Sequence, residues 1–229
     1  MSLESIRAIT LDLYGTVLDV ESSVLQAFDG FLQARGYAGA ALEVVQAWSA
    51  AYFQETLIDT MLGRGRTPFE QISRSTLSQV LSRRGVANTP EEVEGLLSSR
   101  DRGRLFPDAQ EALPALRNGY TLALLSNGDL ASLERAVSNM SIPVDRIISA
   151  EQAGVFKPHP EVYHTAVTEL GLEPGQVLHV AAHAWDIRGA RAFGMRGAYV
   201  NRAGIPYGDS PFPPDLEVAD FRELAARIG

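Results

Sequence analysis

The chain has 229 residues, a net charge of -8, no cysteine and 45% hydrophobic residues, as expected for a folded globular chain with one large domain or a core plus an insert. The acidic balance disfavours a nucleic-acid partner, and the lack of cysteine excludes disulfides, thiolate metal sites and a cysteine nucleophile. The sequence has neither a signal-peptide pattern nor an apolar stretch of the ~18 residues that cross a bilayer. We therefore expect a cytoplasmic protein with no membrane partner.

The first predicted element is a buried strand over residues 6–13, where apolar residues dominate. From about residue 20 to residue 104 the sequence contains no strand candidate, and apolar residues recur at helical spacing. We expect helices over residues 24–32, 42–52, 57–62, 69–81 and 90–99. Thr89 followed by Pro90 is typical of a helix start, with Thr89 as the N-cap.

Short strands and helices alternate after residue 106. The predicted strands cover residues 120–125, 146–149, 177–180 and 198–200. The predicted helices cover residues 109–117, 130–139, 160–170, 185–193 and 221–228. This alternation indicates an α/β fold, with a Rossmann-like parallel sheet and helices on both faces. We expect a core formed by residues 1–19 and 103–229, with residues 20–102 inserted as an α-helical cap.

Polar residues follow four successive predicted strands, where ligands bind in an open parallel sheet. They are Asp12, the pair Ser126 and Asn127, Lys157 and Asp186. Each alone is more often a cap or turn residue, but their common position predicts one catalytic site. Asp12 is the candidate nucleophile, because Gly15 allows a sharp turn that lifts the carboxylate clear of the sheet edge.

This series of motifs resembles the haloacid dehalogenase superfamily over essentially the whole chain. The L-2-haloacid dehalogenases within it are the nearer likeness, and five segments carry this likeness. They are Asp-Leu-Tyr-Gly-Thr at 12–16, Leu-Ser-Asn-Gly at 125–128, Lys157 with Tyr163, Ala-Trp-Asp at 184–186 and Asn-Arg-Ala-Gly at 201–204. The resemblance implies a hydrolase with an inserted helical cap, and it makes a homodimer plausible.

The resemblance also implies an aspartyl-ester mechanism on a small halogenated carboxylate such as a haloacetate. Asp12 would displace the halide, Lys157 would keep Asp12 ionised, and Asp186 would position water or pair with Lys157. We expect substrate contacts from Leu13, Tyr14, Thr16, Ser126, Asn127, Tyr163 and Trp185.

A magnesium-dependent phosphatase is the first alternative, because most members of the superfamily have that activity. Such enzymes carry a second Asp two residues after the nucleophile and an acidic metal ligand in the fourth motif. Tyr14 and Ala182 occupy those places here. We therefore expect no metal and no other cofactor, with Mg²⁺ required only under the phosphatase alternative. A degenerate family member that binds a small carboxylate without turnover is the second alternative.

Two departures from the dehalogenase pattern keep the second alternative open. The cap arginine that receives the halide in the family follows a tryptophan, but Ser49 follows Trp48 here, and Arg64 and Arg66 are the nearest substitutes. The family also has a serine and an asparagine before the Ala-Trp-Asp segment. Here Ala181 and His183 replace them.

His183 is the replacement that can do chemistry. Its imidazole would act as a general base on the ester or, as a cation, would take the halide. His179, by contrast, alternates with apolar residues in a predicted strand, and we expect it to serve in packing.

Overall fold

The computed structural model of the protein describes residues 3–229, which form two compact units. One unit contains the described residues up to Leu18 together with Leu105–Gly229. The other unit contains Asp19–Arg104. Where the chain passes from one unit to the other, the short strands β2 (Leu18–Asp19) and β3 (Arg104–Leu105) pair in a sheet of their own.

The first unit is built on a six-stranded sheet in the order β5-β4-β1-β6-β7-β8, and all neighbouring strands are parallel. Its strands are β1 (Ala8–Leu11), β4 (Thr121–Ser126), β5 (Arg146–Ser149), β6 (Val177–Ala181), β7 (Arg196–Val200) and β8 (Leu216–Val218). The chain starts in β1, adds β4 and β5 on one side and then crosses to β6 on the other. In open parallel sheets, ligands bind beside such a reversal, at the carboxyl ends of the strands.

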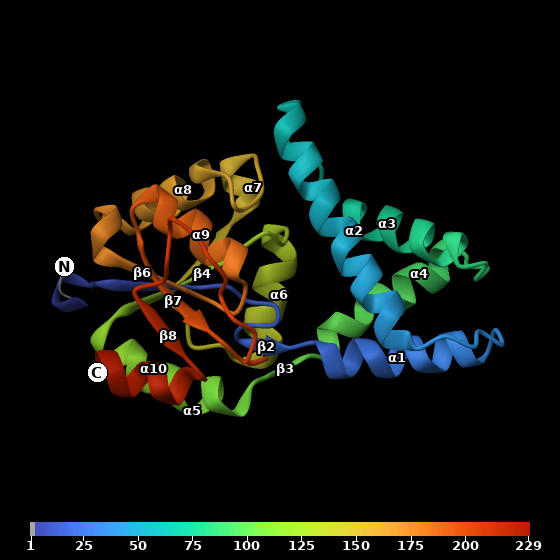
Figure 1. Ribbon diagram of the computed structural model, residues 1–229, viewed down its shortest axis with the longest axis horizontal. Helices are drawn as coiled ribbons and strands as arrows, with labels where there is room; N and C mark the ends of the chain where they lie inside the picture. The colour runs from blue at the N-terminus through green and yellow to red at the C-terminus, as the bar shows by residue number, and fades with distance from the viewer. Residues whose placement is uncertain (1–2) are drawn as a thin grey trace. The chain divides into compact units, whose positions relative to one another are not determined.

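Helices cover both faces of this sheet, with α5 and α10 on one face and α8 and α9 on the other (Figure 1). The helices of this unit are η1 (Leu3–Ser5), α5 (Pro107–Gly119), α6 (Leu130–Met140), α7 (Ala150–Ala153), α8 (Pro160–Leu170), η3 (Pro174–Gln176), α9 (Ala184–Phe193) and α10 (Phe221–Ile228). Because both faces are covered, β1 and β6 are buried along their whole length and are largely apolar. The predicted α/β fold is confirmed.

The second unit is helical. It contains α1 (Glu21–Gln33), α2 (Ala41–Leu62), α3 (Phe69–Arg83), α4 (Pro90–Leu97) and η2 (Ser98–Arg102). Its apolar core gathers around Phe28, Trp48 and Leu77. The predicted N-cap is confirmed, because the Thr89 side chain accepts a hydrogen bond from the backbone N–H of Glu92.

The structure differs from the predicted elements in several places, and two of these differences have a clear physical reason. The helices expected over 42–52 and 57–62 are one continuous helix, α2, because residues 53–56 contain no glycine or proline to break it. Strand β8 was not predicted, since an alternation of buried, exposed and buried residues over three positions is too short to be recognised. None of the helices in the described part of the chain has both the length and the apolarity that a bilayer crossing demands.

Candidate active site

Asp12 lies directly after the central strand β1, at the start of a tight turn. The carbonyl of Leu13 accepts the backbone N–H groups of Val17 and Leu18, each over 2.9 Å, and this closes the turn. Gly15 has φ +76°, a left-handed conformation that side chains disfavour. The turn leaves Asp12 only 7% exposed, so its carboxylate depends on protein partners.

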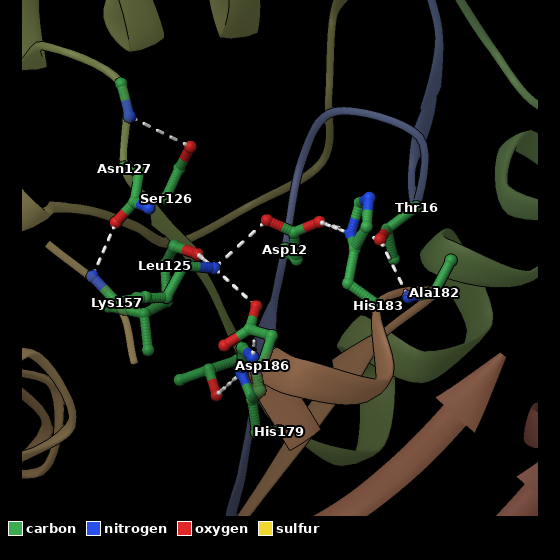
Figure 2. A network of polar contacts seen from close by, with 12 residues as sticks. Asp12, Thr16, Leu125, Ser126, Asn127, Lys157, His179, Ala182, His183 and Asp186 are labelled. Atoms are coloured by element: carbon green, nitrogen blue, oxygen red, sulfur yellow. Dashed lines mark hydrogen bonds and ion pairs between the residues drawn. The ribbon is translucent and has the colours of Figure 1, made fainter. Parts of the chain in front are cut away.

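Three side chains contact the carboxylate of Asp12 (Figure 2). Lys157 Nζ donates to Oδ1 over 3.0 Å, and the Thr16 hydroxyl donates to Oδ2 over 2.7 Å. His183 Nδ1 lies 3.2 Å from the same Oδ2. Burial alone would raise the pKa of Asp12, but the charge of Lys157, followed by His183 and Thr16, outweighs it and holds this pKa well below its usual range. Asp12 is therefore an ionised carboxylate.

The ammonium of Lys157 is 1% exposed and uses its three N–H groups on three oxygens. These are Asp12 Oδ1 at 3.0 Å, the carbonyl of Leu125 at 2.8 Å and Asp186 Oδ2 at 2.6 Å. Burial disfavours the charge, but the two carboxylates outweigh it and raise the pKa of Lys157. The Asn127 side chain accepts a hydrogen bond from the backbone N–H of Lys157 over 2.7 Å. The segment after β4 therefore holds the backbone of the segment that contains Lys157.

Asp186 lies in the first turn of α9 and is fully buried. The Tyr163 hydroxyl donates to its Oδ1 over 2.7 Å, while Oδ2 receives Lys157 and lies 3.0 Å from His179 Nε2. Burial would raise the pKa of Asp186, but His179 and Lys157 lower it. Asp186 thus stays charged and shares one ammonium with Asp12.

His183 immediately precedes α9, and its side chain is 40% exposed. Its ring packs over the turn, since a Cβ added to Gly15 would lie 3.5 Å from the imidazole Cε1. The ring of Trp185 lies 5.7 Å from it, centroid to centroid. Burial works against a charged imidazole, but the hydrogen bond to Asp12 and the charge of Asp12 raise the pKa of His183.

Several of the residues predicted to contact substrate form hydrogen bonds with the predicted catalytic residues. Thr16 bonds Asp12, Asn127 bonds Lys157, and Tyr163 bonds Asp186. Ser126 is 2% exposed, and its Oγ accepts the backbone N–H of Gly128 over 3.3 Å. Tyr163 is fully buried, and its hydroxyl is used on Asp186.

The remaining predicted contacts lie close to the same groups. Leu13 is fully buried within the turn, and Tyr14 forms a backbone bridge with Leu18. Lys157 Nζ lies 5.9 Å from the centre of the Trp185 ring. Figure 2 shows how the polar groups of this site gather around Asp12. They come from the segment after β1, from the end of β4 and the segment after it, from the segment between α7 and α8, and from β6 with the start of α9.

Two polar residues near this site were not predicted to act there, His179 and Arg202. His179, expected only to pack, contacts both Thr10 and Asp186. Arg202 was part of a recognised segment without an assigned role. Its guanidinium donates to the carbonyl of Thr16 over 2.8 Å and to both carboxylate oxygens of Asp108.

The arginines considered as halide acceptors lie in the helical unit. Arg64 is exposed and Arg66 is half-buried. A different arginine of that unit, Arg100, lies over the ring of Trp48 at 4.5 Å from its centre.

The donor set beside Asp12 does not fit a magnesium ion. Among the residues that the structure describes, no group of three or more histidine or carboxylate side chains is arranged to hold a metal. Asp12 and Asp186 are the two carboxylates of the site, and the ammonium of Lys157 already lies between them. Mg²⁺ prefers six oxygen ligands, and Tyr14 and Ala182 supply no carboxylate at the two neighbouring positions.

The fold and the site together define a hydrolase built on an aspartate nucleophile, and comparison with known proteins identifies the family. A family model for haloacid dehalogenase-like hydrolases matches residues 6–194. The chain belongs to this family.

Individual relatives are dehalogenases. The (S)-2-haloacid dehalogenase 1 of Pseudomonas sp. (strain CBS-3) is 32% identical over 97% of this chain and 96% of its own. The haloacetate dehalogenase H-2 of Moraxella sp. (strain B) is 28% identical over 94% of this chain and 95% of its own. The L-2-haloacid dehalogenase of Xanthobacter autotrophicus, solved with chloropropionic acid covalently bound, is 26% identical, with a TM-score of 0.84 and coverage of 97% and 98%. The predicted family and the enzyme class, a 2-haloacid dehalogenase-like hydrolase, are confirmed.

Proposed function

We propose that the protein is a metal-independent 2-haloacid dehalogenase that converts a small halogenated carboxylate, such as a haloacetate, into the 2-hydroxy acid. One observation carries the proposal: the ionised carboxylate of Asp12 bonds the buried ammonium of Lys157 at the carboxyl end of the central strand. A carboxylate held in this way is a nucleophile. A halide leaves as a stable anion, so the lack of an acid at Tyr14 is no obstacle.

In the first step, a carboxylate oxygen of Asp12 attacks the carbon that carries the halogen. The C–O bond forms as the C–halogen bond breaks, and the electron pair of the broken bond leaves with the halide. The carbon is inverted, and an ester of Asp12 remains. Lys157 and Thr16 each bind one carboxylate oxygen and so fix the plane of attack. Backbone N–H groups at Leu13 and Tyr14, with Ser126 and Asn127, bind the substrate carboxylate, and Trp185 walls the pocket.

In the second step, water attacks the carbonyl carbon of the ester. His183 removes a proton from this water and returns it to the departing alkoxide, which becomes the product hydroxyl. The other proton of the water leaves Asp12 for the solvent, and the carboxylate is restored. Asp186 keeps Lys157 charged beside the oxygen that becomes negative as water adds.

The charge on Asp12 changes during the reaction, and this change favours a charged His183 before attack and a neutral His183 during ester breakdown. In the free enzyme Asp12 raises the pKa of His183 and thereby favours the charged imidazole. The ester carries no charge, so this support disappears when the intermediate forms. His183 then loses its proton more readily and becomes a base in the step that needs one. The cationic form present beforehand is the form that would take the halide.

The proposal includes the surroundings of the enzyme. The substrate is a small molecule, no nucleic acid or membrane is bound, no cofactor takes part, and the protein acts in the cytoplasm as a homodimer. Wild type should therefore release halide at the same rate with and without excess EDTA.

Halide release from chloroacetate, fluoroacetate and 2-chloropropionate tests the proposal, with wild type, Asp12→Asn and Asp12→Ala compared in excess EDTA. We expect release by wild type alone. Release of phosphate from a phosphate ester only with magnesium would support the phosphatase alternative instead. Binding of the three acids without any turnover would identify a degenerate binding protein.

Isotope transfer in a single turnover tests the ester itself. With enzyme in excess in H₂¹⁸O, the product hydroxyl should contain ¹⁶O from Asp12, and the label should remain on the Asp12 carboxylate. Mass spectrometry of the product and of the peptide that contains Asp12 measures both. Label in the first product molecule would contradict attack by Asp12 and indicate direct attack by water.

A further inference from the structure

His179 is a buried histidine to which the proposed mechanism gives no role. It lies in the middle of β6, is fully buried, and pairs in register with Thr10 of β1. Its Nδ1 lies 2.9 Å from the Thr10 hydroxyl, and its Nε2 lies 3.0 Å from Asp186 Oδ2. A histidine that serves only in packing needs neither contact, and an apolar side chain would fill the same space without burying polar atoms.

The two contacts determine where the ring carries its proton. The Asp186 carboxylate can only accept, so Nε2, which lies 3.0 Å from it, is the nitrogen that carries the ring proton. Nδ1 is then an acceptor, and the Thr10 hydroxyl, 2.9 Å away, donates to it. Nε2–H is then the group that faces the Asp186 carboxylate. This N–H is not aimed straight at Oδ2, so the contact is a close electrostatic one rather than a well-aligned hydrogen bond.

Asp186 Oδ2 therefore has two neighbours that carry positive charge or partial charge, Lys157 at 2.6 Å and His179 at 3.0 Å. The same ammonium reaches Asp12 only at 3.0 Å. Part of the negative charge on Asp186 is offset by the imidazole N–H, which weakens the hold of Asp186 on Lys157. The Lys157 ammonium is then attracted more strongly to Asp12 than it would be without His179.

We propose that His179 is a positioning residue: anchored by Thr10, it fixes the carboxylate of Asp186 and so sets how the ammonium of Lys157 is shared between Asp186 and the nucleophile Asp12. His179 has no exposed surface and touches neither the substrate nor the reacting atoms. Its effect should therefore appear in the rate of the chemical steps and not in substrate binding. This inference rests on the proposed roles of Asp12 and Lys157.

Three variants isolate the contact with Asp186. His179→Phe keeps a buried aromatic ring but removes both ring nitrogens. His179→Gln restores an N–H at about the place of Nε2. The double variant His179→Phe with Thr10→Val also removes the hydroxyl that His179→Phe leaves without an acceptor, and so separates loss of the Asp186 contact from the cost of burying an unpaired group.

Steady-state halide release gives the first readout. We expect His179→Phe and the double variant to lower kcat about 10-fold with little change in KM, and His179→Gln to recover most of the loss. Leu178→Ala, on the same buried strand but on the face opposite to His179, serves as a control that lowers the melting temperature but leaves kcat unchanged. Equal kcat in wild type and His179→Phe would overturn the inference, as would a failure of His179→Gln to recover activity when both variants are folded.

Nitrogen NMR of histidine-labelled protein gives a readout that does not depend on activity. We expect the His179 ring to carry its proton on Nε2 and its signals to shift in Thr10→Val and in Asp186→Asn. A ring protonated on Nδ1, or ring signals that are the same in wild type and in both variants, would overturn the proposed contacts of His179 with Thr10 and Asp186. Absence of halide release by wild type would instead contradict the proposed function, and the NMR result would still decide the hydrogen-bond arrangement.

Discussion

Lys157 bonds Asp186 over 2.6 Å but Asp12 over 3.0 Å, so the one buried ammonium lies closer to Asp186 than to the proposed nucleophile. The two carboxylates share this ammonium, and His183 lies against Asp12 as well. Asp186 is further bonded by Tyr163, whereas Asp12 is the carboxylate that remains partly exposed. Asp12 is thus the carboxylate of the pair that a substrate can reach.

Replacement of Lys157 should affect both stability and reaction. Lys157→Met leaves Asp12 and Asp186 buried without a counter-charge, which costs about 3–5 kcal/mol in the free energy of unfolding. The pKa of Asp12 should rise, because its largest opposing charge is gone and burial then dominates. We expect halide release to become undetectable, and urea denaturation with a chloride assay measures both effects.

Lys157→Arg is the matched control, since it keeps the charge. Its planar fork cannot direct three donors at three oxygens as an ammonium does, so we expect a folded protein with strongly reduced kcat. Lys157→Met with the activity of wild type would contradict the role given to this ammonium.

His183 should govern breakdown of the ester, and its pH dependence has a definite sign. The neutral imidazole is the base, so the rate of ester breakdown should fall as pH decreases and His183 takes up a proton. Asp12 raises the pKa of His183 in the free enzyme, and this pKa should be lower in the uncharged ester. The midpoint for ester breakdown, measured by acid quench and mass spectrometry, should therefore lie below the midpoint of His183 titration in the free enzyme.

His183→Ala, which removes the imidazole without installing the asparagine that the family carries at this position, separates the two roles considered for this residue. If His183 is the base, the variant should release one equivalent of halide rapidly and accumulate esterified Asp12. If His183 receives the halide, the first release should itself be slow and no ester should accumulate. An unchanged rate for both steps would exclude both roles.

The sequence alone predicted the part of the site that follows from topology. Asp12, Lys157 and Asp186 lie far apart in the sequence, but each follows a strand of one parallel sheet, and such strands end at the same edge. The nucleophile turn was equally predictable, because a glycine after a strand-terminal Asp indicates it.

The contacts of His179 could not be predicted, because periodicity shows that a residue is buried but not which polar atom it meets. Its partner Thr10 is 169 residues away and faces it only through the register of β1 with β6. The role of Arg202 was missed for a similar reason. An arginine after a strand is usually a solvated surface charge, and the sequence does not show that Asp108 lies beside it in the fold.

Gly189 allows α9 to approach Tyr163 closely. A Cβ at this position would lie 2.7 Å from Pro158 Cβ and 2.9 Å from Tyr163 Cε2, so something must shift. Gly189→Ala should move the Tyr163 hydroxyl away from Asp186, lower the stability by about 1–3 kcal/mol and reduce kcat. Gly30→Ala, in α1 with no atom within 4 Å of the added Cβ, should instead stabilise by about 0.5–1 kcal/mol. Thermal denaturation compares the two, and a stabilised Gly189→Ala would contradict the close packing.

Arg202 should hold Thr16 in the position from which its hydroxyl bonds Asp12. Its guanidinium bonds the carbonyl of Thr16 and both oxygens of Asp108, and it lies over the ring of Phe106 at 3.8 Å from its centre. Arg202→Lys keeps the charge but cannot form the paired bonds to Asp108 together with those to Thr16. Thr16 should then shift, and its hydroxyl should lose the 2.7 Å bond that orients Asp12.

We expect Arg202→Lys to lower the free energy of unfolding by about 1.5–3 kcal/mol, the range for a partly buried hydrogen-bonded charge, and to reduce kcat more than it changes KM. Arg222→Lys is the control: Arg222 forms a similar paired contact with Glu111, but on the exposed surface, where such pairs contribute little. Chemical denaturation and halide release compare the two variants. If both changed stability and kcat equally, the effect of Arg202 would belong to ion pairs in general and not to its contact with the Thr16 carbonyl.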